Sequence, residues 1–143
     1  MAITQAMSTS FKVQLLNGTQ NFSADTFKLA LYTSSATLGE NTTAYSATNE
    51  VPSTGNYSAG GNTLTVSVTP TNSGNVAYIS FANTSWANAT ITANGALIYN
   101  SSKSNSAVAV LAFGGDKTST NGTFAVNFPT ADASNAIIRL TAS

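Results

Sequence analysis

The chain has 143 residues, no cysteine and no histidine, and its five basic and five acidic residues cancel to a formal net charge of zero. The length predicts one domain, residues 1–143, that is large enough to fold without a disulfide or a metal. Scattered charges argue against a nucleic-acid-binding protein and against an electrostatic membrane-surface role, because both depend on clustered basic residues. Solubility must rest on Ser, Thr and Asn, which favours a large assembly or an outer surface.

The N-terminal segment, residues 1–18, contains the one predicted helix. Within residues 7–18 apolar side chains recur at a spacing of four around Phe11, Ser8 opens a run of three N-capping residues, and Gly18 offers a C-terminal stop. Alternate residues from Phe11 onward are also apolar, which fits a strand, so the helix is favoured only slightly. The segment has neither a basic region nor a long apolar core, and we expect no secretory signal.

The most regular predicted strand covers residues 26–32, where alternate apolar residues indicate a half-buried strand. Periodicity then disappears from residue 33 to residue 61. A loop of this length is unusual in a compact domain, and such loops are often functional or face a partner. Glu40 and Glu50 within it are predicted to be solvated loop acids, because a carboxylate pair of the glycosidase type would require the loop to fold back on itself.

Two further strands are predicted at residues 63–69 and 76–82, and Pro70 is expected to end the first of them. Trp86 is placed in a polar connection, residues 83–88. A short strand at residues 90–93 follows.

The most apolar stretch, residues 94–116, is predicted to form a hairpin at the centre of the sheet. Its strands, residues 95–99 and 107–113, are separated by a polar turn, and the second is apolar on both faces. Asn94 and Gly95 are predicted to form a tight turn before the first strand, because a type I′ turn needs two residues with positive φ.

The C-terminal part is predicted to contain another turn and two strands. Asn121 and Gly122 form the turn, and the strands cover residues 123–128 and 136–141. About seven to nine short strands with turn signals between them predict an all-β protein, an antiparallel β-sandwich with one short N-terminal helix. The pattern leaves jelly-roll and immunoglobulin-like topologies open.

No motif indicates an enzyme, a metal site or a cofactor site, and we expect no catalytic, metal-binding or cofactor-binding residue. The chain lacks a histidine base and a cysteine nucleophile, and no serine lies in a G-x-S-x-G elbow. Asp25, Asp116 and Asp132 are isolated from other acids, whereas calcium needs clustered oxygens. Residues 114–118 lack the spacing of a phosphate-binding loop.

Aromatic residues outside the predicted strands are candidates for partner contacts, because an amphipathic ring suits an interface. The candidate partner contacts are Phe11, Tyr45, Val51, Tyr57 and Trp86. Tyr45, Tyr57 and Trp86 also fit a platform for stacking on sugars. A Trp in such a connection more often folds back to cap the sandwich.

Seven segments carry a family resemblance that extends over nearly the whole chain. They are residues 10–22 (SFKVQLLNGTQNF), 25–38, 42–51, 57–66, 95–102, 107–119 (AVAVLAFGGDKTS) and 128–140. In this combination the chain resembles small virion structural proteins of tailed bacteriophages. The resemblance implies a capsid decoration (cement) protein that is assembled in the host cytoplasm and sits on the capsid exterior. It further implies the major capsid protein and copies of the chain itself, as a trimer, for partners, with no nucleic acid or membrane.

In this hypothesis many weak contacts from residues 1–18 and 33–61 bridge neighbouring capsid subunits, and repetition over the shell supplies avidity. Deleting residues 1–10 is expected to leave a folded β protein that no longer decorates heads. Two alternatives stay open. One is a tail component (a tube, adaptor or fibre domain), and the other is a glycan- or receptor-binding module on the virion.

Overall fold

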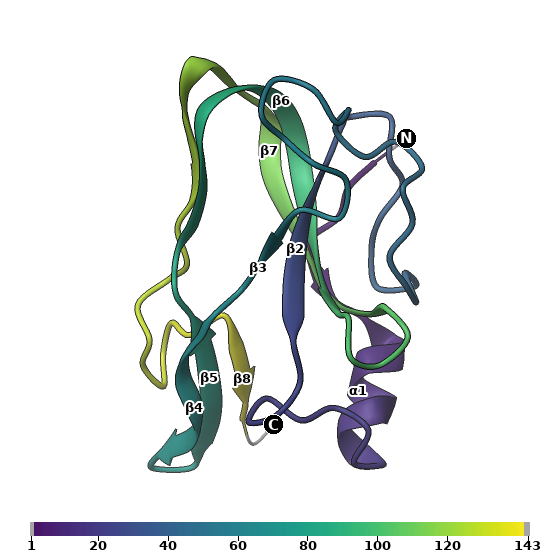
Figure 1. Cartoon of the computed structure of the whole chain (residues 1–143). Coiled ribbons are helices and arrows are strands. Elements are labelled where there is room, and N and C mark those ends of the chain that lie inside the picture. Colours follow the sequence, from purple (N-terminus) through teal and green to yellow (C-terminus); the bar gives the residue numbers. More distant parts are fainter. Residues whose placement is uncertain (1, 142–143) are drawn as a thin grey trace.

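The computed structural model describes residues 2–141 and confirms the predicted fold class, an all-β sandwich with one short helix (Figure 1). One sheet has five antiparallel strands in the order β1-β7-β6-β2-β3, and the other has three in the order β4-β5-β8. The elements are β1 (Ala6–Met7), α1 (Thr9–Leu16), β2 (Phe27–Tyr32), β3 (Asn62–Thr63), β4 (Val66–Ser73), β5 (Val76–Phe81), β6 (Thr84–Asn100), β7 (Ser106–Val126) and β8 (Ile138–Leu140).

The helix is confirmed, and the alternative of a strand is wrong. Ser8 caps α1 by accepting a hydrogen bond from the backbone N–H of Phe11 at 3.2 Å. Beyond the C-cap residue, Gly18 has a φ of 79°, as expected of a helix stop. The Phe11 ring is fully buried, so it is the anchor that holds α1 on the sandwich.

β6 and β7 form one long bent hairpin where several short strands were predicted. They run 17 and 21 residues, and Figure 1 shows the ribbon arching over one end of the molecule. Between the pairs Ala93–Lys117 and Gly95–Ala112 the register shifts, with two steps along β6 against five along β7. Such bulges bend a strand and increase its twist, so a single ribbon can contribute to both ends of the core.

The predicted turns at Asn94–Gly95 and Asn121–Gly122 are therefore wrong, because both pairs lie inside the ribbon. Gly95 is needed for close packing instead, since a Cβ at this position would meet the backbone oxygen of Leu111 at 2.6 Å. Asn121 has a φ of 47° at a second register shift, so the pair serves a bulge.

The predictions for Pro70 and Trp86 are also wrong. β4 continues through Pro70 to Ser73, since it is an edge strand and its register shifts between Val68 and Thr71, where the missing N–H is tolerated. Trp86 lies within β6 and is buried, so it does not belong to a connecting loop.

β2 is buried on both faces, whereas a half-buried strand was predicted. Leu29 and Leu31 face the main core, while Ala30 and Tyr32 belong to a second apolar cluster. Ala36 and the partly buried Leu38 from the 33–61 loop complete this second cluster. The loop therefore packs as a layer over the sheet and does not extend freely into solvent.

Candidate functional site

The two segments predicted to contact a partner lie side by side. Ile3 forms a parallel bridge with Leu38, and the N–H of Thr4 donates to the oxygen of Leu38 at 2.9 Å. Thr9 N–H donates to the oxygen of Glu40 at 2.8 Å. Figure 1 shows the N-terminal segment and the first, blue part of the 33–61 loop on the same flank of the sandwich. We call the exposed part of residues 2–5 and 34–49 the contact surface; a groove of about 980 Å³ runs through it.

The contact surface is polar and nearly free of charge. Glu40 is the one charged residue in these two stretches of sequence. The exposed residues with hydroxyl or amide side chains are Thr4, Gln5, Ser34, Ser35, Thr37, Asn41, Thr43, Ser46, Thr48 and Asn49. Hydrogen bonds from such groups are weakly affected by salt, unlike contacts between exposed charges.

A buried carboxylate holds the second half of the 33–61 loop in place. Glu50 is only 9% exposed and accepts hydrogen bonds from the phenols of Tyr45 and Tyr57, both at 2.6 Å, and from the N–H of Gly60 at 2.7 Å. The Tyr57 oxygen also accepts a bond from the N–H of Leu31 at 2.9 Å. The prediction that Glu50 is a solvated loop acid is therefore wrong, because the loop folds back over β2.

Two more tyrosines complete this cluster. The Tyr32 hydroxyl donates to the oxygen of Ser46 at 2.7 Å, and the Tyr99 hydroxyl donates to the oxygen of Gly60 at 2.8 Å. The rings of Tyr45 and Tyr99 stack at a centroid distance of 4.7 Å. Four of the five tyrosines in the chain thus converge on the loop end. We call Glu50 and these four tyrosines the tyrosine cluster.

The tyrosine cluster keeps its phenols protonated. Burial, followed by the hydrogen bond with Glu50, raises the pKa of Tyr57 and of Tyr45. Burial, followed by the negative charge of Glu50, raises the pKa of Tyr32 and brings that of Tyr99 to about 12. Ionising any of these phenols would place a second negative charge beside a carboxylate in a poorly solvated region.

These raised pKa values predict a loss of stability at high pH. The tyrosines of the unfolded chain ionise near pH 10, whereas the folded state holds its protons to higher pH. Stability is therefore fully present below about pH 10 and falls as the pH rises toward the folded-state pKa, by about 1.4 kcal/mol per pH unit for each titrating group. Urea unfolding at about pH 8 and about pH 11 should show this loss, and Tyr57→Phe should reduce it. Equal stability at both values would contradict the prediction.

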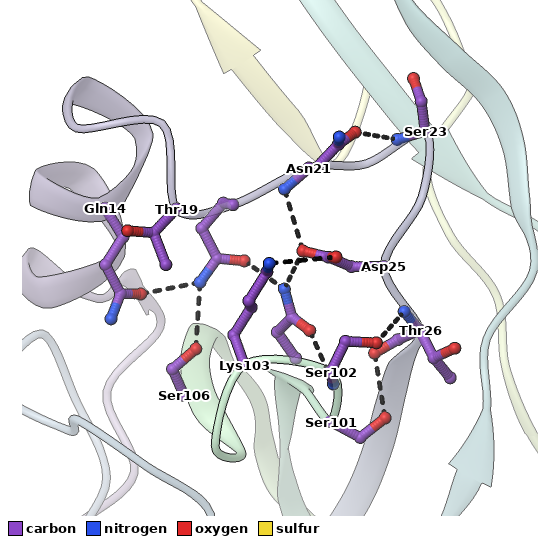
Figure 2. Close-up of polar contacts among 12 residues, drawn as sticks. Gln14, Thr19, Asn21, Ser23, Asp25, Thr26, Ser101, Ser102, Lys103 and Ser106 are labelled. Carbon is purple, nitrogen blue, oxygen red and sulfur yellow. Dashed lines mark hydrogen bonds and ion pairs between the residues drawn. The ribbon is translucent and has the colours of Figure 1, made fainter.

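A second polar cluster fastens α1 to the turn between β6 and β7 (Figure 2). Asn100 is fully buried, and its Nδ2 donates to Gln20 Oε1 at 2.7 Å and to Asp25 Oδ2 at 2.8 Å. Gln20 Nε2 in turn donates to Ser106 Oγ at 3.0 Å and to Gln14 Oε1 at 2.7 Å. The cluster thereby ties the residues after α1 to the turn, so the N-terminal segment is held in place at both ends.

The polar groups of both clusters are hydrogen-bonded within the protein. Lys103 Nζ lies 3.8 Å from Asp25 Oδ1, in the one ion pair found among residues 2–141. Within that same range every buried side-chain nitrogen and oxygen has a hydrogen-bond partner, and no three metal-binding side chains gather. The hydrogen bonds of the two clusters hold the 33–61 loop and the segment after α1 against the sheet.

The residues predicted as partner contacts occupy other places than expected. Phe11, Val51, Tyr57 and Trp86 are core residues, each at most 6% exposed, so the protein's own residues cover them. Trp86 lies 5.6 Å from the ring of Tyr57, inside the sandwich. Tyr45 is half-buried on Tyr99. Of the three rings in the sugar-stacking alternative, Tyr57 and Trp86 are therefore buried, and Tyr45 is partly covered.

Sequence reasoning missed the partners of Glu50. The available signal was the single acid between Tyr45 and Tyr57, just before a long uncharged stretch that runs from residue 51 to residue 102. A carboxylate flanked by phenols has donors within reach once the loop folds back. Tyr99 could not be recognised as a member of the same cluster, because it lies far from Glu50 along the chain.

Comparison with known proteins gives no family for the chain. No protein-family model matches it, and no curated protein or solved structure matches it at a significant level. In residues 2–141 no helix has the length and apolar character needed to cross a membrane.

Proposed function

We propose that the protein is a structural component of a bacteriophage virion that decorates the outer capsid surface and bridges neighbouring capsid subunits. Its partners are the major capsid protein and further copies of itself, arranged as a trimer. The observation that carries the proposal is the contact surface. Two segments distant in the sequence are joined there by backbone hydrogen bonds into one polar, nearly uncharged face.

The rigidity of the contact surface favours this role. Ordering a flexible loop on binding usually costs free energy. A loop that the tyrosine cluster already fixes avoids most of that cost. Each hydrogen bond from an exposed hydroxyl contributes only about 0.5 to 1.5 kcal/mol. Repetition of such contacts around a shell then gives strong overall attachment without a single strong site.

Substitutions on the contact surface test the proposal. Asn41→Arg and Thr43→Arg place a long charged side chain on exposed positions and are expected to weaken binding to undecorated shells about tenfold, or about 1.4 kcal/mol. Ser67→Arg and Thr69→Arg, on exposed positions of β4, are the matched controls. Co-sedimentation with purified shells measures the affinity.

The proposal fails if the four variants and the unmodified protein bind shells equally well. Binding to isolated tails but not to shells would favour the tail component instead. Either result is informative, because all four positions are exposed and none lies in the tyrosine cluster.

The structure argues against deleting residues 1–10 as the test. That deletion removes β1 and the capping residue Ser8, whose side chain is fully buried, and it takes Ile3 away from Gly95. Loss of the cap alone costs about 1 kcal/mol. The truncated chain is therefore expected to be destabilised, and a binding defect would not identify the surface.

A further inference from the structure

One side of the sandwich is open along a strand edge. β1 pairs with β7 only at Ala109 and Val110, and within residues 2–141 no backbone group pairs with the outer side of β7 from residue 113 to residue 126. In the second sheet β8 pairs only with β5, so its other side is also an edge. Unpaired edges of this kind are templates for another strand.

Two adjoining hollows, of about 530 Å³ and about 300 Å³, lie along these edges and share Gln5, Leu111 and Ile137 in their walls. We call the two together the seam. Its walls include the partly buried apolar side chains Phe113 and Phe128, which pack against the main core. The seam thus offers apolar surface beside unpaired backbone groups.

The backbone of the β7 edge donates a hydrogen bond into the seam, where Gln5 accepts it. Its Oε1 accepts a bond from the backbone N–H of Ala112 at 3.3 Å, next to the position where β1 diverges from β7. A side-chain amide here takes the place of the acceptor that a neighbouring strand would supply. An extended chain entering the seam can continue this pattern with its own backbone.

The charges around the seam have one sign. Lys117 lies in the wall of the larger hollow and Arg139 in the wall of the smaller one, while no acidic residue lines either. Neither cation forms an ion pair with another described residue. Asp132 is near enough for Arg139 to help lower its pKa, after the hydrogen bonds from Asn135 and Ser134, but it does not line the seam. The seam therefore complements an acidic occupant.

We propose that the seam binds one extended segment of a partner protein by strand addition to the outer edge of β7. The segment carries apolar side chains at alternate positions, which enter the seam, and an acidic residue that faces Lys117. Backbone hydrogen bonds supply the affinity, while the apolar positions and the charge supply the selectivity. The seam lies on other residues than the contact surface except for Gln5, which borders both, and the inference does not depend on the proposed function.

A peptide titration of the full-length protein tests this inference. The probe is the capped peptide Asp-Val-Thr-Val-Thr-Val-Asp, followed through the backbone amide signals of the protein by NMR. We expect shifts confined to residues around the seam, and about tenfold weaker binding to Lys117→Glu than to the unmodified protein. Lys12→Glu, the same charge reversal at an exposed position on α1, is the matched control and should bind as the unmodified protein does.

Two further peptides distinguish strand addition from nonspecific binding. Proline in place of the central Val removes a backbone donor, and lysine in place of both Asp residues reverses the charge; both changes should abolish the seam shifts. Seam shifts that are equal for all three peptides, or absent with the acidic peptide, would overturn the inference. Seam shifts that depend on protein concentration without peptide would assign the edge to a second copy and would also overturn it.

Discussion

Replacing Glu50 with alanine is expected to lower the free energy of unfolding by about 3 to 5 kcal/mol. The carboxylate accepts hydrogen bonds from Tyr45, Tyr57 and Gly60, and its removal leaves these donors without an acceptor in a buried position. The loop end would then lose the contact that closes it over β2. Glu50→Gln keeps one acceptor oxygen and should cost less than the alanine variant.

Urea unfolding at neutral pH measures this effect, with Glu40→Ala as the control. Glu40 lies in the same loop but is exposed, so its replacement should change stability by less than about 0.5 kcal/mol. If Glu50→Ala were as stable as Glu40→Ala, the tyrosine cluster would not fix the loop. The rigidity argued for the contact surface would then lose its support.

Gly61→Ala is expected to have an effect of similar or greater size. The φ of Gly61 is 73°, and a Cβ at this position would overlap the backbone oxygen of Leu29 in β2. Backbone atoms of a central strand cannot yield as a flexible side chain can, so β3 would be forced away from β2. We expect a loss of more than about 4 kcal/mol, which places the substitution among the most damaging classes.

Gly74→Ala is a matched control for this substitution. Gly74 also has a positive φ, of 58°, but open space surrounds the position that a Cβ would occupy. Its replacement should cost only the backbone strain, about 1 to 2 kcal/mol. Thermal unfolding of both variants compares them, and equal losses would show that the close approach of Gly61 to β2 does not govern stability.

The elements that were predicted correctly are those with a strong local pattern. α1 has a capping serine and a glycine stop within one short stretch, and β2 lies where apolar residues alternate most regularly. These signals depend on neighbouring residues, so they survive without knowledge of the tertiary structure.

The long β6–β7 ribbon was not predictable in the same way. An Asn-Gly pair is compatible with positive φ in a hairpin turn and also in a bulge, and the choice depends on the opposite strand. At Gly95 the deciding contact is with Leu111, which lies far along the chain. Prediction from neighbouring residues alone therefore divided one ribbon into several strands.

The candidate site shows the same division. The sequence singled out residues 1–18 and 33–61 as segments without a clear place in the core, and the structure brings parts of them together. It did not reveal that the aromatic residues of these segments point inward. Burial of Tyr57 is decided by its packing against Trp86 between the sheets, and no spacing of residues encodes it.

A density map of the purified virus particle tests the central claim most directly. We expect copies of this 14.6 kDa sandwich on the outer face of the shell, with residues 2–5 and 34–49 turned toward the capsid subunits. Particles that are complete without the protein, or density for it only in the tail, would contradict the account.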